Sequence, residues 1–233
     1  MVVRTDLHSW LLPLLRARRD DWAGYDTYAL AAGRGGARRI RAVGHDVVVR
    51  PYRRGGLAAR MLHDTYFGWR PRPFRELYTL EALRLRGAPV VDVYAAAVRW
   101  LMPGCYRGWL VTRYIAGSLT LWEWVADAPP VPLRARVFAH VGRAIRRLHD
   151  RGGWHPDLNL NNILIDPIPE AGPPEVWFID FDLAHGATRL PRPPRADLAR
   201  LERSARKLDP DGTRVTAADL EALRAAYDGA VCG

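Results

Sequence analysis

A polar segment from His155 to Leu164 is the feature that most constrains how this chain can fold. It reads His-Pro-Asp-Leu-Asn-Leu-Asn-Asn-Ile-Leu. A helix is expected over 132–151, because apolar residues recur there every three or four positions, and Gly152-Gly153 ends it just before the segment. Two short apolar runs, 163–165 and 176–179, follow and predict a hairpin. The segment is therefore expected to be a loop between a helix and a hairpin, with its polar side chains converging.

Three side chains of this region have the chemistry and spacing that phosphoryl transfer requires. Asp157 would accept the proton of an acceptor hydroxyl, and Asn162 would coordinate Mg²⁺. Asp180, which follows the hairpin, would link the metal to the phosphates of a nucleotide triphosphate. Taken singly, the three residues are also explained as a turn former, a cap and a strand-end carboxylate. The whole set favours catalysis.

Two further residues of the same region are expected to support the site. His155 is expected to hold the loop by hydrogen bonding rather than to act as a base. Asp182 closes the triplet Asp180-Phe181-Asp182 and is placed beside the metal ligand in the sequence.

The rest of the chain predicts an α+β fold of two lobes. Three short strands separated by glycine turns are expected first, over 25–31, 37–43 and 46–50. A helix over 72–85 and a strand pair over 90–100 and 109–114, joined by Pro103-Gly104, come next. The later helices are expected over 132–151, over 196–208 and after the capping pattern Thr216-x-x-Asp219. The predicted lobes are 1–115, mostly β, and 116–233, mostly α.

If the second lobe carries the catalytic loop, the first lobe should hold the nucleotide. Gly33 and Gly35 lie in the first glycine turn, where backbone amides can cover phosphates. Arg50 on the third strand supplies a cation, and Glu76 on the next helix is its expected partner, with Glu81 as the alternative. Glycine turns and exposed helix-face ion pairs are common, so these assignments depend on the catalytic loop.

Charge and cysteine content narrow the class of protein. The net charge of +10 indicates an anionic partner, although Lys207 is the only lysine and an arginine-rich composition explains the charge equally well. Cys105 and Cys232 lack the spacing of a disulfide framework or a zinc site, which favours a reducing cytoplasm. No motif for nucleic-acid binding is present.

Hydropathy predicts peripheral membrane contact at most. The apolar segment 10–15 contains a proline and is followed by arginines, so it does not read as a signal peptide. No run approaches the roughly 18 apolar residues that a membrane span requires.

The loop and the triplet resemble the catalytic motifs of protein-kinase-like enzymes. Three departures argue against a protein kinase: Pro156 replaces the arginine that senses a phosphorylated activation loop, Ala-Pro-Glu is missing after Asp180, and only about fifty residues follow the triplet. A small-molecule or lipid-linked sugar acceptor is therefore expected.

From about residue 25 to 208, the chain resembles the 3-deoxy-D-manno-octulosonic acid (Kdo) kinases, relatives of the lipopolysaccharide core heptose kinases. The similar segments are Gly33-Arg34-Gly35, 49–57, Phe74-Arg75-Glu76, 155–159, 162–164 and 179–182. The resemblance implies an enzyme that uses ATP and Mg²⁺ to phosphorylate the 4-hydroxyl of Kdo on a lipid A precursor. It also implies a place on the cytoplasmic face of the inner membrane of Gram-negative bacteria.

Such an acceptor is anionic and membrane-bound. Arg53, Arg54 and Arg60 would pair with its phosphates and carboxylate, and the aromatic residues Tyr66, Phe67 and Trp69 would rest at the headgroup boundary. Simple packing of these aromatics is an equal alternative. A heptose kinase or an antibiotic phosphotransferase shares the loop spacing, and a kinase-like binding module without activity is the alternative from another class.

Overall fold

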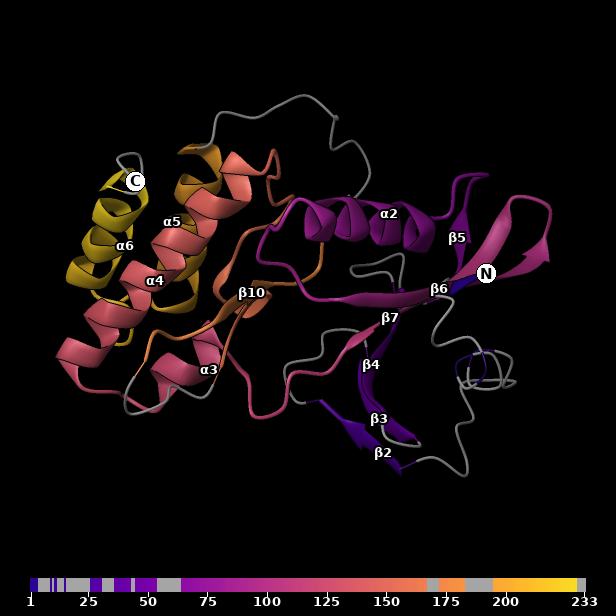
Figure 1. The fold of residues 1–233 in the computed structure, drawn as a ribbon, viewed down its shortest axis with the longest axis horizontal. Helices are drawn as coiled ribbons and strands as arrows, with labels where there is room; N and C mark the ends of the chain where they lie inside the picture. Colours follow the sequence, from indigo (N-terminus) through magenta and orange to yellow (C-terminus); the bar gives the residue numbers. More distant parts are fainter. Residues whose placement is uncertain are drawn as a thin grey trace. The chain divides into compact units, whose positions relative to one another are not determined.

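The computed structural model describes residues 1–3, 9, 11, 15, 26–30, 36–42, 45–53, 64–166, 172–182 and 195–229. The chain folds into two compact units (Figure 1). Unit 1 comprises residues 1–81 and 92–114, and unit 2 comprises residues 82–91 and 115–233. Residues 82–91, which the sequence analysis assigned to the first lobe, thus group with unit 2.

Unit 1 is built on an antiparallel sheet of seven strands in the order β1-β6-β7-β4-β3-β2, with β5 paired to β7. The strands are β1 (Val2–Val3), β2 (Asp26–Ala29), β3 (Arg38–Ala42), β4 (His45–Pro51), β5 (Tyr66–Phe67), β6 (Val93–Met102) and β7 (Cys105–Arg113). The three strands expected at the start of the chain are β2, β3 and β4. The hairpin β6–β7 turns at the expected Pro103-Gly104, where Gly104 has a positive φ of 73° that suits glycine.

Side chains along β4 alternate between the two faces of the sheet, so the core residues and Arg50 lie on opposite faces. Val47 and Val49 are fully buried on one face of the sheet. They belong to an apolar cluster with Leu11, Ile40, Ala95, Ala97, Trp109 and Val111. Arg50 follows Val49 directly, so its side chain leaves the strand on the opposite face.

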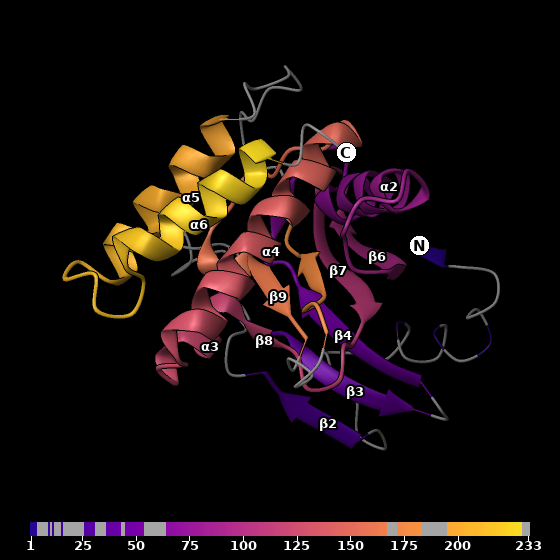
Figure 2. The same cartoon turned by 60° about the vertical axis from the view of Figure 1, so that its left-hand side comes forward.

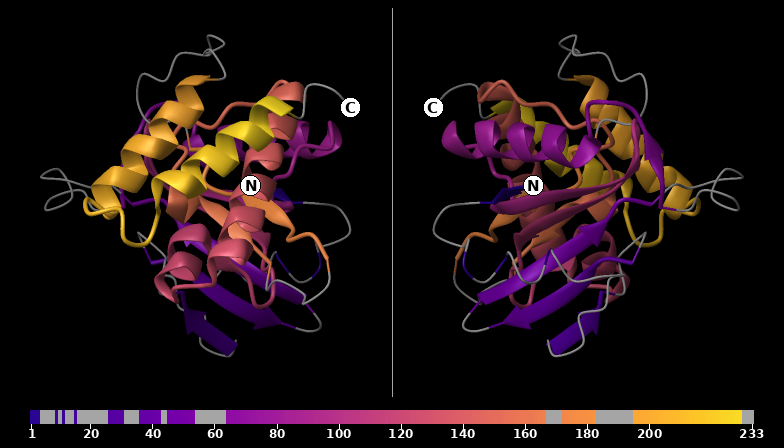
Figure 3. Two further views of the ribbon diagram at one scale, coloured as in Figure 1. Left: turned by 90° about the vertical axis from the view of Figure 1, so that its left-hand side faces the viewer. Right: turned by 90° about the vertical axis from the view of Figure 1, so that its right-hand side faces the viewer.

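Helix α2 (Arg72–Leu85) has the bounds that the sequence predicted, and it lies along the sheet (Figures 1 and 3). A side chain at Gly108 of β7 would collide with Pro73, so glycine permits the close approach of helix and strand. The backbone N–H of Arg72 donates to the hydroxyl of Tyr106 at 3.0 Å. The start of α2 is therefore fixed to β7.

Unit 2 is helical around a three-stranded antiparallel sheet in the order β10-β9-β8. Its elements are β8 (Leu119–Thr120), α3 (Leu121–Ala126), α4 (Val131–Asp150), the 3₁₀ turn η4 (Leu160–Asn162), β9 (Ile163–Ile165), β10 (Val176–Phe178), α5 (Arg195–Leu208) and α6 (Ala217–Gly229). Helices α4 and α6 run side by side (Figure 2), and the carbonyl of Leu223 occupies the space that a Cβ at Gly142 would need. The β9–β10 hairpin is the one that the sequence predicted.

The predicted strand over 90–100 is wrong at its start. Val90 does not join β6, which begins at Val93; it forms a parallel bridge with Phe178 of β10. The N–H of Phe178 also donates to the carbonyl of Pro89 at 2.9 Å. These bonds explain why the segment after α2 belongs to unit 2. Within the described part of the chain, no helix is both long and apolar enough to cross a bilayer.

Candidate active site

His155 joins the two halves of the predicted catalytic centre within unit 2. Its Nδ1 accepts the N–H of Asp157 at 3.1 Å, and its Nε2 donates to the carbonyl of Ile179 at 2.8 Å. These partners fix the neutral tautomer with the proton on Nε2. Complete burial lowers the pKa of His155, and the ring of Phe181 packs 4.5 Å from it between centroids. His155 thus connects the loop to the residue before Asp180 as a neutral group. The sequence analysis predicted only that His155 holds the loop by hydrogen bonding.

The predicted catalytic loop is closed by side-chain amides. Nδ2 of Asn162 donates to the carbonyl of Asp157 at 2.9 Å, and Nδ2 of Asn159 donates to the same oxygen at 3.0 Å. The carbonyl of Asn162 accepts the N–H of Ile179 at 3.1 Å, so Asn162 and Asp180 lie at adjoining positions of the hairpin. The side chain of Asp157 is 63% exposed, which leaves its carboxylate accessible to a substrate.

Asp180 has an unusual backbone conformation for a residue with a side chain. Its φ is 65°, in the left-handed region that aspartate tolerates better than most residues but still at a cost. Such strain concentrates at functional sites. Asp180 and Asp182 are half-buried on either side of the buried Phe181.

The residues of unit 2 fit a Mg²⁺ ion by the chemistry of their donors. Because the amide nitrogen of Asn162 is used in the loop, its amide oxygen is the atom that can face a metal. Carboxylate oxygens of Asp180 complete a set of hard oxygen ligands, which Mg²⁺ prefers.

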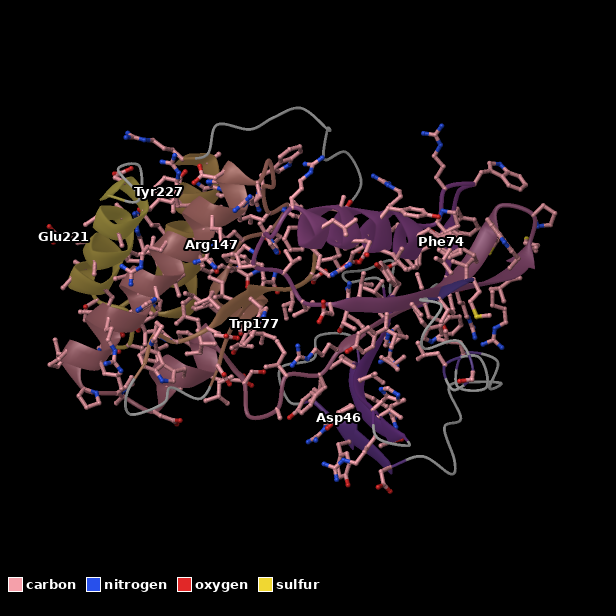
Figure 4. The ribbon with its side chains drawn as sticks, viewed as in Figure 1. Asp46, Phe74, Arg147, Trp177, Glu221 and Tyr227 are labelled. Carbon is pink, nitrogen blue, oxygen red and sulfur yellow. The ribbon has the colours of Figure 1, made fainter. Side chains whose placement is uncertain are left out.

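A buried polar chain anchors the loop from the helices. Asp197, in the first turn of α5, accepts the N–H of His155 at 2.8 Å and lies 3.2 Å from Nε2 of His149 on α4. Nδ1 of His149 lies 2.8 Å from the hydroxyl of Tyr227 on α6, which Figure 4 labels. The sequence analysis missed Asp197, because an aspartate in the first turn of a helix indicates only a favourable charge at the helix start.

Arg200 was also missed. Its Nη1 lies 3.2 Å from Oδ1 of Asp157, and both side chains are partly exposed. Arg200 follows Asp157 by 43 residues and is one of many arginines, so no local pattern marked it.

In unit 1, Arg50 pairs with Glu76. Nη2 of Arg50 lies 2.6 Å from each carboxylate oxygen of Glu76, and the side chain of Glu76 is almost completely buried. The hydroxyl of Tyr52 also donates to Glu76, a contact that the sequence did not indicate. A buried carboxylate needs such partners, so the pair fixes the guanidinium on the face of the sheet opposite to Val49.

Several of the predicted binding residues lie outside the described residues, namely Gly33, Gly35, Arg54 and Arg60. The end of the first glycine turn is described at Gly36, which has a φ of 79°. A Cβ at Gly36 would lie 2.6 Å from Nη1 of Arg53, so Arg53 lies against this turn. Tyr66, expected beside Phe67 and Trp69 at a membrane surface, is instead buried with 3% exposure.

The comparison with protein families matches residues 25–227 to the lipopolysaccharide kinase (Kdo/WaaP) family. The chain belongs to this family. Two relatives named 3-deoxy-D-manno-octulosonic acid kinase agree with the assignment. The first, from Xylella fastidiosa (strain 9a5c), is 36% identical over 216 residues, which cover 89% of this chain and 81% of the relative. The second, from Xanthomonas campestris pv. campestris (strain B100), is 39% identical over 204 residues, covering 84% and 76%.

Solved structures confirm the kinase-like fold. "WaaP in complex with acyl carrier protein" is similar with a TM-score of 0.58 at 22% identity, covering 88% of this chain and 78% of that one. "Glucosamine kinase (crystal form B)" is similar with a TM-score of 0.53 at 14% identity, covering 91% and 70%. The resemblance stated from the motifs is therefore confirmed, and the chain is a phosphotransferase with a hydroxyl acceptor.

Proposed function

We propose that this kinase transfers the γ-phosphoryl group of ATP to the 4-hydroxyl of Kdo on a Kdo-lipid A precursor. It would act in the synthesis of the lipopolysaccharide inner core, bound peripherally to the cytoplasmic face of the inner membrane. The observation that carries the proposal is the arrangement of Asp157, Asn162 and Asp180 around the buried His155. The names of the relatives support the choice of acceptor.

In unit 2, each residue of the loop has a defined task. Asp157 accepts the proton of the 4-hydroxyl, and its exposure suits a group that must meet a bulky acceptor. The amide oxygen of Asn162 and the carboxylate of Asp180 would hold Mg²⁺, with Asp182 in support. When bound, Mg²⁺ neutralises charge on the ATP phosphates. His155 holds Asp157 and Asp180 at fixed relative positions, because it forms hydrogen bonds with both the loop and Ile179.

In unit 1, Arg50 binds an ATP phosphate. Its ion pair with the buried Glu76 holds the guanidinium in one place, which lowers the entropy lost on binding. Gly33 and Gly35 cover the phosphates with backbone amides, as in other glycine loops. Arg53 and Arg54 pair with anionic groups of the acceptor.

Acceptor choice is tested by offering three acceptors side by side. Wild-type protein is incubated with labelled ATP and Mg²⁺ and with a Kdo-lipid A precursor, a heptosylated core or an aminoglycoside. Label on the Kdo-lipid A precursor, removed by phosphatase and assigned to position 4 of Kdo by NMR, is the expected result. Label confined to the other two acceptors would overturn the Kdo assignment.

The role of Asp157 is tested by Asp157→Ala. Transfer should fall by about two to four orders of magnitude, because a positioned general base contributes roughly that much. The thermal unfolding midpoint should stay close to that of the wild type, since the Asp157 side chain is largely exposed. Asp211→Ala, which removes another exposed carboxylate of unit 2, is the control and should retain activity. Wild-type turnover in the Asp157 variant would refute the assignment.

A further inference from the structure

The free end of the β6–β7 hairpin, together with β5, exposes a group of large apolar side chains. We refer to Phe67, Trp69, Trp100, Leu101 and Met102 as the hairpin tip. Their exposed fractions are 54%, 74%, 46%, 47% and 62%, respectively. Turns between strands usually carry small or polar residues, and exposed apolar clusters mark binding surfaces. Figure 1 shows β5 beside this end of the hairpin.

The exposed rings are held in place from within unit 1. Trp69 and Trp100 lie 6.1 Å apart between ring centroids, and Trp100 contacts the edge of the buried Tyr106 at 5.5 Å. The N–H of Gly68 donates to the carbonyl of Gly104 at 2.8 Å, which fastens the residues after β5 to the turn. Binding through the tip would therefore require little ordering of side chains.

Positive charge surrounds the tip. Every charged residue in the two segments 65–75 and 93–113 is an arginine, and the acidic residues that directly precede them, Asp64 and Asp92, pair with Arg107 and Arg113. Arg70 directly follows Trp69 and is exposed. Arg99 stands over the ring of Trp109 at 5.3 Å, and Arg107 pairs with Asp64 at 2.9 Å. An apolar tip bordered by arginines is complementary to an anionic lipid membrane, where negative headgroups lie above the hydrocarbon.

We propose that the hairpin tip inserts into the headgroup region of an anionic lipid membrane and anchors the kinase there. Tryptophan favours this interfacial region, and the water among the headgroups leaves hydrogen-bond partners for the backbone groups of the turn. The arginines favour an anionic lipid surface over a second copy of this basic chain. The choice of the inner membrane as the target rests on the proposed function.

Co-sedimentation with vesicles tests the inference. Vesicles of phosphatidylglycerol and phosphatidylethanolamine are compared with vesicles of phosphatidylcholine alone. Wild-type protein should bind the anionic vesicles more strongly, and binding should weaken with added salt. In Trp69→Ser with Met102→Ser, the partition coefficient should fall about ten-fold or more, because two large apolar groups no longer leave water.

A matched pair of substitutions serves as the control. Tyr78→Ser with Leu85→Ser also removes two exposed apolar side chains, 62% and 71% exposed, but from α2. This control should bind vesicles like the wild type. Equal binding by the tip variant and the control would overturn the inference, as would a wild type that ignores anionic vesicles. Self-association that depends on the tip in the absence of lipid, without vesicle binding, would make a second copy the partner instead.

Kinase activity separates this inference from the proposed function. With a water-soluble, deacylated Kdo acceptor, the tip variant should work as fast as the wild type. With the same sugar on a vesicle-bound lipid, it should lose activity in step with its binding. If neither acceptor is phosphorylated by the wild type but the tip still governs vesicle binding, the proposed function fails alone. If both acceptors are phosphorylated equally by variant and wild type, the membrane inference fails alone.

Discussion

The ion pair between Arg200 and Asp157 is placed where chemistry, not stability, would benefit from it. Both side chains are partly exposed, and exposed ion pairs contribute about 0–1 kcal/mol to folding. Nη1 of Arg200 contacts Oδ1 of Asp157, and the other N–H groups of Arg200 would be able to bind the anionic acceptor that we propose. Arg200 thereby adds a charged group to the loop that no nearby sequence supplies.

Arg200→Ala should lower kcat/KM for the acceptor about ten-fold while leaving the unfolding midpoint within about 2 °C of the wild type. Arg206→Ala is the matched control, because Arg206 also lies on α5 and also makes an exposed ion pair, with Glu202. Steady-state kinetics with varied acceptor and thermal unfolding measure the two effects. An Arg200 variant with unchanged kcat/KM would show that the pair is only a surface contact.

At this same scale, sequence spacing explains which site residues were predictable. His155, Asp157 and Asn162 lie in one loop, and Asp180 follows a hairpin whose length is readable from apolar runs. Their relation could therefore be inferred from the chain itself. Asp197 and Arg200 reach the loop only because α5 packs there, and packing between distant segments leaves no spacing pattern in a single sequence.

Among the elements, α4 and α6 show how close packing supports the loop. Gly142 lets the two helices approach, since any Cβ there would meet the carbonyl of Leu223. Near the start of α4, the buried Arg134 forms an ion pair with Asp219 of α6. Asp219 also accepts hydrogen bonds from the N–H and hydroxyl of Thr216, at 2.8 Å each, so the predicted capping box is confirmed. Both helices contribute to the polar chain behind His155.

Gly142→Ala should lower the free energy of unfolding by about 1–3 kcal/mol, because the added methyl group forces α4 and α6 apart. Helix propensity alone would favour alanine by about 1 kcal/mol, so the sign of the change is informative. Gly229→Ala, at the end of α6, is the control and should not destabilise, because no described residue lies within 4 Å of the added Cβ. Urea unfolding of both variants measures the difference, and a stabilised Gly142 variant would contradict the packing.

Element prediction succeeded where the repeating pattern was long. The bounds of α2 were predicted without error, α4 lies one residue earlier than predicted, and α5 begins one residue earlier but ends where predicted. In all three helices apolar residues recur over three or more turns. Short elements were missed, namely β1, β5, β8 and α3. A pattern of two residues cannot distinguish a strand from a loop. The structure shows a capping box of Thr120 and Glu123 at the start of α3, a signal that the sequence analysis did not use.

For the whole molecule, buried or paired titratable groups link stability to pH. Burial lowers the pKa of His155 below its ordinary value of 6.5, and burial together with nearby arginines lowers the pKa of His140. Hydrogen bonds from Arg39 and Arg224 lower the pKa of Asp46 and Glu202, respectively. The backbone N–H of Val215 and its neighbours lower that of Asp209.

These directions predict two stages of acid destabilisation. Well above pH 6.5, His140 and His155 are neutral in both the folded and the unfolded chain, so they do not change the free energy of unfolding with pH. As the pH falls below 6.5, the unfolded chain takes up protons that the folded protein resists, and stability falls by up to about 1.4 kcal/mol per pH unit for each such proton. The three carboxylates lower the stability further only when the pH falls below their ordinary pKa values of 3.8 to 4.5, because there the unfolded chain takes up protons before the folded protein does.

Urea unfolding at pH 8, 7, 6 and 5 measures the first stage, which lies well above the carboxylate range. His155→Gln should make the decline less steep by about one proton, whatever its effect on stability at pH 8, because glutamine does not titrate. His140→Gln, which removes the other histidine whose pKa is lowered, should also make the decline less steep. A slope unchanged by His155→Gln would mean that His155 takes up a proton in the folded state, which its bond from the N–H of Asp157 opposes, since a protonated Nδ1 has no lone pair to accept it.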